Sequence, residues 1–364
     1  MSVKRFETPM SVIGLALAVV GIQQLASLSG REFYLTQLIM SAYYVVVVLG
    51  LCLVMGYAGQ VSLGHGAFFA IGGYCSAFLT TCDLAVARQA AWGQWLRSAG
   101  VLVARPDLYG QPILTVAPWA AFVTAMAVTF VIALLIGYPS LRLKGHYLAM
   151  ATLGFGLIVY RLVLGSQTLG AADGINGVPP WTLGPGLAVS GEQSHRVANY
   201  YIAWGFALAV MVVLLNLTRS RVGRALRSIH DGELAANAMG IDTASYKLRA
   251  FVLSAMLAAA AGCLLTHYNA GIGPSEAGAL KSVRYVSLVA AGGMANLWGT
   301  LTVSTVLTFL SLRGCFGSFD DAVFGIILIV IVALAPEGPL KPAGEWARRL
   351  VNRGSEGRVR RGAA

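Results

Sequence analysis

The sequence predicts an all-α integral membrane protein with about ten transmembrane helices, and three observations support this. Of the 364 residues, 57% are hydrophobic and 11% are charged, whereas soluble domains carry roughly 25% charged residues. The hydrophobic residues gather in long runs, and the charges lie between those runs. The 43 glycines suit close helix packing in a bilayer, where small residues let helix backbones approach each other.

Ten apolar runs match the length that a bilayer span requires, about 20 residues, or fall somewhat below it. Several of them are short or interrupted. They cover residues 10–29, 33–55, 60–81, 113–137, 146–165, 199–217, 250–270, 284–296, 299–312 and 321–336. We therefore expect one transmembrane domain over residues 1–340. A basic, Gly-rich cytoplasmic tail over 341–364 is expected to follow it.

The distribution of Lys and Arg predicts how the chain is oriented. With the N-terminus inside the cell, 17 of these residues fall in inner segments and 8 in outer segments, and Arg161 is left within a span. Cytoplasmic loops carry the excess of basic residues in membrane proteins. Both termini are therefore expected in the cytoplasm. The net charge of +11 is then explained by the basic loops on the cytoplasmic side of the membrane, and no nucleic acid is expected as a partner.

Two segments contain glycine and polar residues where a span should be apolar. In GYAGQVSLGHGAFFAIGGY, over residues 56–74, these are Gln60, Ser62, Gly64, His65 and Gly66. In VSLVAAGGMANLWGT, over residues 286–300, they are Gly292, Gly293 and Asn296. Glycine lowers helix propensity, and an interrupted helix leaves polar backbone that lipid cannot satisfy. Both segments are therefore expected to be broken helices.

Broken segments at corresponding places in two halves of a chain indicate a transporter's binding region and an internal repeat. The eight residues named above are the candidates for the translocation path. The alternative is that these glycines only permit tight helix packing.

The segment 219–249 differs from its apolar surroundings because it is basic. Small and apolar residues recur at helical spacing up to Gly240, a typical helix stop, so the pattern predicts an amphipathic helix. Such a helix between two spans lies either on anionic lipid or on a cytoplasmic partner. Its apolar face lacks the Trp and Phe that anchor an interfacial helix, which favours a protein partner.

The sequence carries no motif for catalysis or for metal binding. It has no GxxxxGK[ST], HExxH or GxSxG, and its five cysteines have no metal-ligand spacing, so no catalytic residue, metal or cofactor is expected. The fifteen acidic residues fall in loops or at span ends. The histidines near spans (His65, His146 and His267) are more often structural donors than proton relays. The sequence therefore predicts a solute path without an energy source of its own.

Four stretches resemble the permeases of high-affinity branched-chain amino-acid ABC importers: residues 56–74, RLKGHYLAMATLGFG (142–156), residues 219–255 and LAPEG (334–338). The similarity covers about residues 35–340. The resemblance implies a bacterial inner-membrane subunit paired with a second homologous permease, two cytoplasmic ABC ATPases that use ATP and Mg²⁺, and a periplasmic solute-binding protein. It also implies an ATPase-docking loop, although the Leu-Pro that closes the fuller pattern of that loop is absent. The expected coupling residues are Arg224, Glu233, Ala235, Ala236 and Gly240.

The solute and the two long outer loops are less defined. Related permeases carry urea, short amides or aromatic acids with similar motifs, so these solutes remain alternatives to Leu, Ile and Val. A passive channel is a remoter alternative, because a channel needs no cytoplasmic docking element such as 219–249. The outer loop 166–198 is rich in turn residues and is expected to shape an outer mouth. The outer loop 82–111 is longer than the resemblance implies, and no role is assigned to it.

Overall fold

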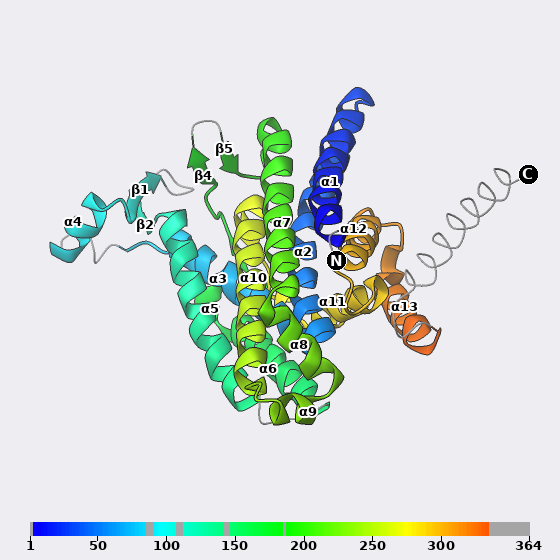
Figure 1. The fold of residues 1–364 in the computed structure, drawn as a ribbon. Helices are drawn as coiled ribbons and strands as arrows, with labels where there is room; N and C mark the ends of the chain where they lie inside the picture. The colour runs from blue at the N-terminus through cyan, green and yellow to red at the C-terminus, as the bar shows by residue number, and fades with distance from the viewer. Residues whose placement is uncertain (1–2, 85–90, 107–111, 141–145, 185–186, 335–364) are drawn as a thin grey trace, which may run out of the picture.

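The computed structural model describes the chain except residues 1–2, 85–90, 107–111, 141–145, 185–186 and 335–364. The tail predicted over 341–364 and the LAPEG stretch after Leu334 thus lie outside the described residues. The described part is mostly helical (Figure 1). A helix lies in each predicted apolar run: α1 (Val3–Leu28), α2 (Phe33–Cys52), α3 (His65–Thr81), α5 (Pro118–Ser140), α6 (His146–Gly165), α7 (Arg196–Arg219), α10 (Thr243–Asn269), α11 (Ala279–Gly292), α12 (Leu297–Leu312) and α13 (Asp320–Leu334).

Six helical segments are long and apolar enough to cross a membrane. They are Ser11–Leu28, Phe33–Tyr57, Pro118–Pro139, Tyr147–Gly165, Gln193–Arg219 and Thr243–Asn269. Helices α3, α11, α12 and α13 have 14 to 17 residues. At about 1.5 Å per residue, these four are shorter than the roughly 30 Å of bilayer hydrocarbon. The structure therefore confirms a helical membrane bundle and shows that its helices differ in length.

Helix α2 is the centre of the bundle. It continues through a π-helical turn, Leu53–Tyr57, and every residue from Ser41 to Tyr57 is buried. It packs against α7, α10, α11 and α12, and it is seen beside α7 in Figure 1. A helix that is apolar on all sides is stable where other helices surround it. The Val-rich sequence of α2 thus explains its central position.

Small residues bring α3 and α10 into close contact. A Cβ added at Gly72 would overlap the backbone of Ala259, and one added at Gly262 would overlap the carbonyl of Phe69. The Cys263 thiol donates to Gly72 O at 3.1 Å. Dispersion and backbone contacts of this kind hold membrane helices together where lipid provides no hydrophobic driving force.

The two ends of the bundle have different architectures (Figure 1). At one end lie helix α4 (Ala91–Ser98) and three antiparallel strand pairs: β1 (Leu102–Pro106) with β2 (Pro112–Val116), β3 (Ile175–Asn176) with β6 (Gly271–Ile272), and β4 (Trp181–Gly184) with β5 (Leu187–Val189). At the opposite end lie the helices α8 (Arg221–Asp231) and α9 (Glu233–Ala238). The predicted outer loop 166–198 therefore contains the β4–β5 hairpin, and the predicted cytoplasmic segment is helical. The β1–β2 pair extends from the loop 82–111 into the predicted apolar run 113–137, whose first residues form a strand.

We predict that Gly72→Val destabilises the folded chain, because its side chain would meet the backbone of Ala259. Overpacking of this kind costs on the order of 1–3 kcal/mol, which thermal unfolding of the detergent-solubilised chain would measure. Gly205→Val on α7 is the control, because a Cβ there meets no atom within 4 Å. Equal losses in both variants would show that the α3–α10 contact is not the cause.

Candidate translocation and coupling site

The first broken segment is interrupted where the sequence predicts it. The chain is non-helical over residues 58–64, between the π-helical end of α2 and the start of α3. Gly59 has a φ of 67°, a left-handed conformation that favours glycine. The amide of Gln60 donates to Val54 O at 3.0 Å, and the side-chain oxygen of Gln60 is buried without a hydrogen-bond partner in the described part of the chain. The break therefore places a polar atom inside the bundle.

Both buried histidines connect helices. The His65 ring lies 2.7 Å from Ser254 Oγ on α10 through Nε2, and 3.2 Å from Ser62 Oγ through Nδ1. The His267 ring lies 2.8 Å from Ser76 Oγ on α3 and 2.7 Å from Pro179 O. Because each ring uses both nitrogens in hydrogen bonds, these contacts support the structural interpretation of the histidines. The His146 side chain lies outside the described residues.

Gly64 and Gly66 hold the first break between neighbouring elements. A Cβ at Gly64 would lie 3.0 Å from Thr152 O on α6. A Cβ at Gly66 would lie 2.8 Å from Ser282 Oγ on α11 and 3.2 Å from Glu276 O. The Gly66 amide also donates to Ser282 Oγ at 3.2 Å. Both glycines are therefore required by close packing, whatever further role they have.

The second broken segment lies between α11 and α12, over residues 293–296. Gly293 has a φ of 89°. Asn296 caps α12, because its Oδ1 accepts from Gly299 N at 3.1 Å. A Cβ at Gly292 would overlap the backbone of Thr300, so α11 and α12 approach closely just beside the turn. Capping and packing thus account for Asn296 and Gly292, and the side chain of Asn296 is committed to the cap.

The end of α2, directly before the first break, contacts the second break. The Tyr57 hydroxyl donates to Ala295 O at 2.9 Å, and the Cys52 thiol donates to Met294 O at 3.2 Å. A Cβ at Gly56 would overlap Met294 O. None of the residues that make these contacts is therefore among the eight candidates for the translocation path. Those eight form two groups: Gln60 to Gly66 contact α6, α10 and α11, and Gly292 to Asn296 contact α12.

The prediction of one amphipathic helix ending at Gly240 is wrong. Ser220 caps a new helix, α8, by accepting from Val222 N at 3.1 Å, and the extended backbone of Gly232 separates α8 from α9. Gly240 lies beyond the end of α9 with a φ of 82°. As a consequence Ala235, Ala236 and Gly240 do not share one helical face. Ala236 is buried within the chain, whereas Ala235, Gly240 and Arg224 are exposed.

Helix α9 is fixed to α10 on one side and open on the other. The Glu233 carboxylate pairs with Lys247 Nζ at 2.6 Å, and Thr243 Oγ1 donates to Asn237 Oδ1 at 3.1 Å. Asp242 caps α10, and its hydrogen bonds from Ser245 hold the pKa of the Asp242 carboxyl below its ordinary value. Leu234 and Met239 are 78% and 83% exposed. Neither residue is among the coupling residues predicted from the sequence, although both are large apolar side chains that α9 and its C-terminal turn expose.

Helix α8 reaches the end of α2 and the first break. The Arg227 guanidinium lies 5.4 Å from the centre of the Tyr57 ring, a cation–π contact, and Arg227 Nη2 donates to Thr218 O at 3.0 Å. A Cβ added at Gly59 would lie 3.0 Å from Nδ1 of His230, which is on α8. A displacement of α8 would therefore act directly on Tyr57 and the first break.

Two groups of partly buried ion pairs were not predicted. Glu276 lies in the 3₁₀ turn Pro274–Ala277, near a span end as predicted, and its Oε1 accepts from Lys281 Nζ at 3.0 Å and from the Tyr44 hydroxyl of α2 at 3.1 Å. Arg284 of α11 pairs with Asp320 and Asp321 at the start of α13. The Tyr44 and Asp320 contacts join segments that lie far apart along the chain, so no local pattern in the sequence predicts them.

A bundle in whose described part six helical segments are long and apolar enough to cross a membrane defines a multi-pass membrane protein. Residues 33–332 match the family described as "Branched-chain amino acid transport system / permease component", and the chain belongs to this family.

Curated relatives support this assignment. The chain is 28% identical to the branched-chain amino acid transport permease LivM of Escherichia coli, over 86% of this chain and 71% of that protein. It is 25% identical to BraD of Pseudomonas aeruginosa, over 84% and 95%, and 23% identical to LivH of Escherichia coli, over 82% and 91%. No solved structure matches the chain.

We predict that Tyr57→Phe weakens the contact between the end of α2 and the second break. The variant removes the hydroxyl that donates to Ala295 O and keeps the ring beneath Arg227. We expect a loss of about 0.5–1.5 kcal/mol in unfolding free energy, with a larger effect on solute uptake than on membrane insertion. Tyr147→Phe is the control, at a position that is 70% exposed on α6. Unchanged stability and uptake in Tyr57→Phe would argue against a role for this contact.

Proposed function

We propose that the chain is the permease subunit of an ATP-driven importer that carries branched-chain amino acids from the periplasm to the cytoplasm. The observation that carries this proposal is the contact between α8 and the first break at Tyr57 and Gly59. This contact gives a partner bound to α8 and α9 a mechanical connection to the interrupted helices. The printed names of LivM, LivH and BraD all refer to branched-chain amino acid transport, which supports the choice of solute.

The proposed partners are a second homologous permease, two cytoplasmic ABC ATPases and a periplasmic solute-binding protein. Two of the relatives, LivM and LivH, are differently named permeases from one organism, which supports a pair of related subunits. The chain has no P-loop sequence. ATP and Mg²⁺ are therefore assigned to the partners, with no cofactor, metal or catalytic residue in this chain.

For the topology, we propose that the permease domain spans residues 1–340 and that the four short helices complete ten spans in the bacterial inner membrane. An even number of spans places both termini on one side. The end with α8 and α9 carries Arg219, Arg221, Arg224, Arg227, Lys247 and Arg249, so the positive-inside rule assigns that end and both termini to the cytoplasm. The two breaks are the proposed counterparts of an internal repeat.

For the path, we propose that the solute passes beside the first break, where Gln60, Ser62, Gly64, His65 and Gly66 lie. The buried side-chain oxygen of Gln60, which has no hydrogen-bond partner in the described part of the chain, supports this choice. Gly292, Gly293 and Asn296 are proposed to form the opposing turn, which sets the position of Met294 and Ala295 against Tyr57.

Uptake by the reconstituted complex tests the solute and the mechanism together. We expect ATP-dependent uptake of labelled leucine into proteoliposomes, competed by isoleucine and valine and unaffected by excess urea, short amides or an aromatic acid. Competition by one of those compounds, without competition by valine, would transfer the proposal to that solute class. Solute flux that needs no ATP would support the passive channel instead.

Coupling is tested on the exposed apolar side chains of α9 and the turn after it. We predict that Leu234→Glu and Met239→Glu weaken copurification of the ATPases and reduce uptake at least tenfold, because a charge replaces an apolar contact that desolvates on docking. Leu183→Glu is the control, because Leu183 is 51% exposed in β4, at the opposite end of the bundle. Normal ATPase binding by both α9 variants would contradict the docking role.

A further inference from the structure

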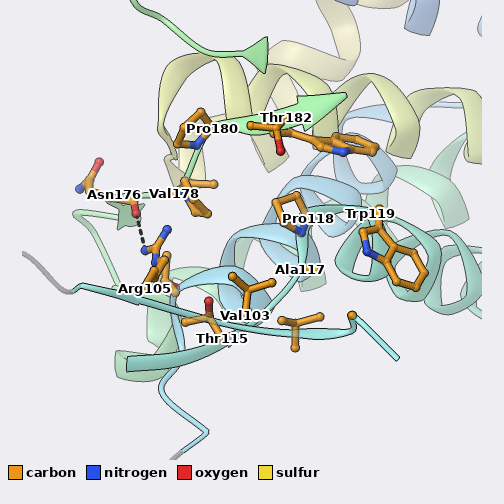
Figure 2. Close-up of a pocket in the computed structure, with 16 residues that line it drawn as sticks. Val103, Arg105, Thr115, Ala117, Pro118, Trp119, Asn176, Val178, Pro180 and Thr182 are labelled. Atoms are coloured by element: carbon orange, nitrogen blue, oxygen red, sulfur yellow. Dashed lines mark hydrogen bonds between the residues drawn. The ribbon is translucent and has the colours of Figure 1, made fainter. Parts of the chain in front are cut away.

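A large pocket lies at the end of the bundle opposite α8 and α9. Its volume is about 850 Å³, which is within the range of small-molecule sites. The hairpin β1–β2 forms one wall, residues 176–182 form the other, and the start of α5 closes one side (Figure 2). The pocket includes Val103 and Arg105 of the outer loop 82–111, to which no role was assigned from the sequence.

The hairpin presents its side chains to the pocket by strand alternation. Val103 and Arg105 are two residues apart on β1 and therefore lie on the same face of the strand, and Thr115 is paired directly with Val103. Figure 2 shows these three side chains facing Val178 and Pro180 across the pocket.

Several contacts hold the opposite wall in place. Pro179 O lies 2.7 Å from His267 Nδ1 of α10. The Trp181 ring lies 5.7 Å from the His267 ring and 5.2 Å from the Phe122 ring of α5. Arg105 Nη2 donates to Gly177 O at 3.1 Å and so joins the two walls. A pocket fixed in this way binds a ligand without a large ordering cost.

The lining indicates the class of ligand. Among the described residues that line the pocket, Arg105 is the ionisable one and none is acidic. Its planar guanidinium matches the geometry of a carboxylate, and with five N–H donors it can contact a ligand while it keeps the hydrogen bond to Gly177 O and its other contacts. Apolar surface comes from Trp119, Trp181, Val103, Val178 and the prolines. The described lining favours an anion with an apolar body, and none of its residues offers a carboxylate to an ammonium group.

We propose that this pocket is a binding site for a small carboxylate with a branched or aromatic apolar body. In this site Arg105 contacts the carboxylate, and Trp119 and Trp181 contact the apolar part. The site lies outside the broken helices, and the proposal stands independently of the transport function. It is therefore tested by binding to the chain and not by uptake.

The probe is 4-methylpentanoate, titrated into the full-length chain with its copurifying subunits in lipid nanodiscs, with binding followed by calorimetry and tryptophan fluorescence. We expect saturable binding, with at least tenfold weaker binding of 4-methylpentanamide, which has the same shape but no charge. Arg105→Gln should weaken binding of the acid at least tenfold. Arg97→Gln is the matched control, because Arg97 is exposed on α4 and does not line the pocket.

A second variant separates the loss of ligand contacts from loss of the hairpin. Thr182→Trp fills the pocket from an exposed lining position and leaves Arg105 in place, and it should also abolish binding while the unfolding temperature stays that of the parent chain. Absence of acid binding to the parent chain would overturn the proposal. Equal binding by Arg105→Gln, or equal binding of the acid and the amide, would overturn it as well.

Discussion

Lipid offers no hydrogen bonds, and this constraint governs the arrangement of the two breaks. An interrupted helix in a bilayer has polar backbone groups that must find partners inside the protein. The break after α2 satisfies the Gln60 amide with Val54 O. The break after α11 receives hydrogen bonds at Ala295 O from Tyr57 and at Met294 O from Cys52. The end of α2, at the centre of the bundle, supplies the donors for the second break.

Close backbone approach is the second requirement, and glycine provides it at specific places. Gly56 fits against Met294, Gly72 against Ala259, and Gly292 against Thr300. Any side chain at these positions would separate the helices and remove the short hydrogen bonds beside them. Tight packing also leaves little free space around these contacts, so we expect a displacement of α8 to move Tyr57 through the Arg227 contact.

The two ends of the bundle differ in the chemistry of their side chains. One end has a basic helix pair that is fixed by the Glu233–Lys247 ion pair and exposes apolar residues, which is suited to a protein partner. The other end has short hairpins around a pocket in whose described lining Arg105 is the ionisable residue. Between them, the Glu276–Lys281 pair on Tyr44 holds the start of α11 against α2.

The sequence by itself determined the helices, the two breaks, the basic end and the family, because burial periodicity, glycine content and motif similarity are local properties. It failed within residues 219–240, where the Ser220 cap and the extended Gly232 divide the predicted helix and bury Ala236 apart from Ala235. Only the tertiary structure brought Tyr57 to Ala295, 238 residues away, and Tyr44 to Glu276, 232 residues away. The pocket at Arg105 likewise depends on the tertiary structure, because its walls come from separate segments of the chain. Local patterns specify which residues are buried or polar, but the choice of partner depends on packing across the whole bundle.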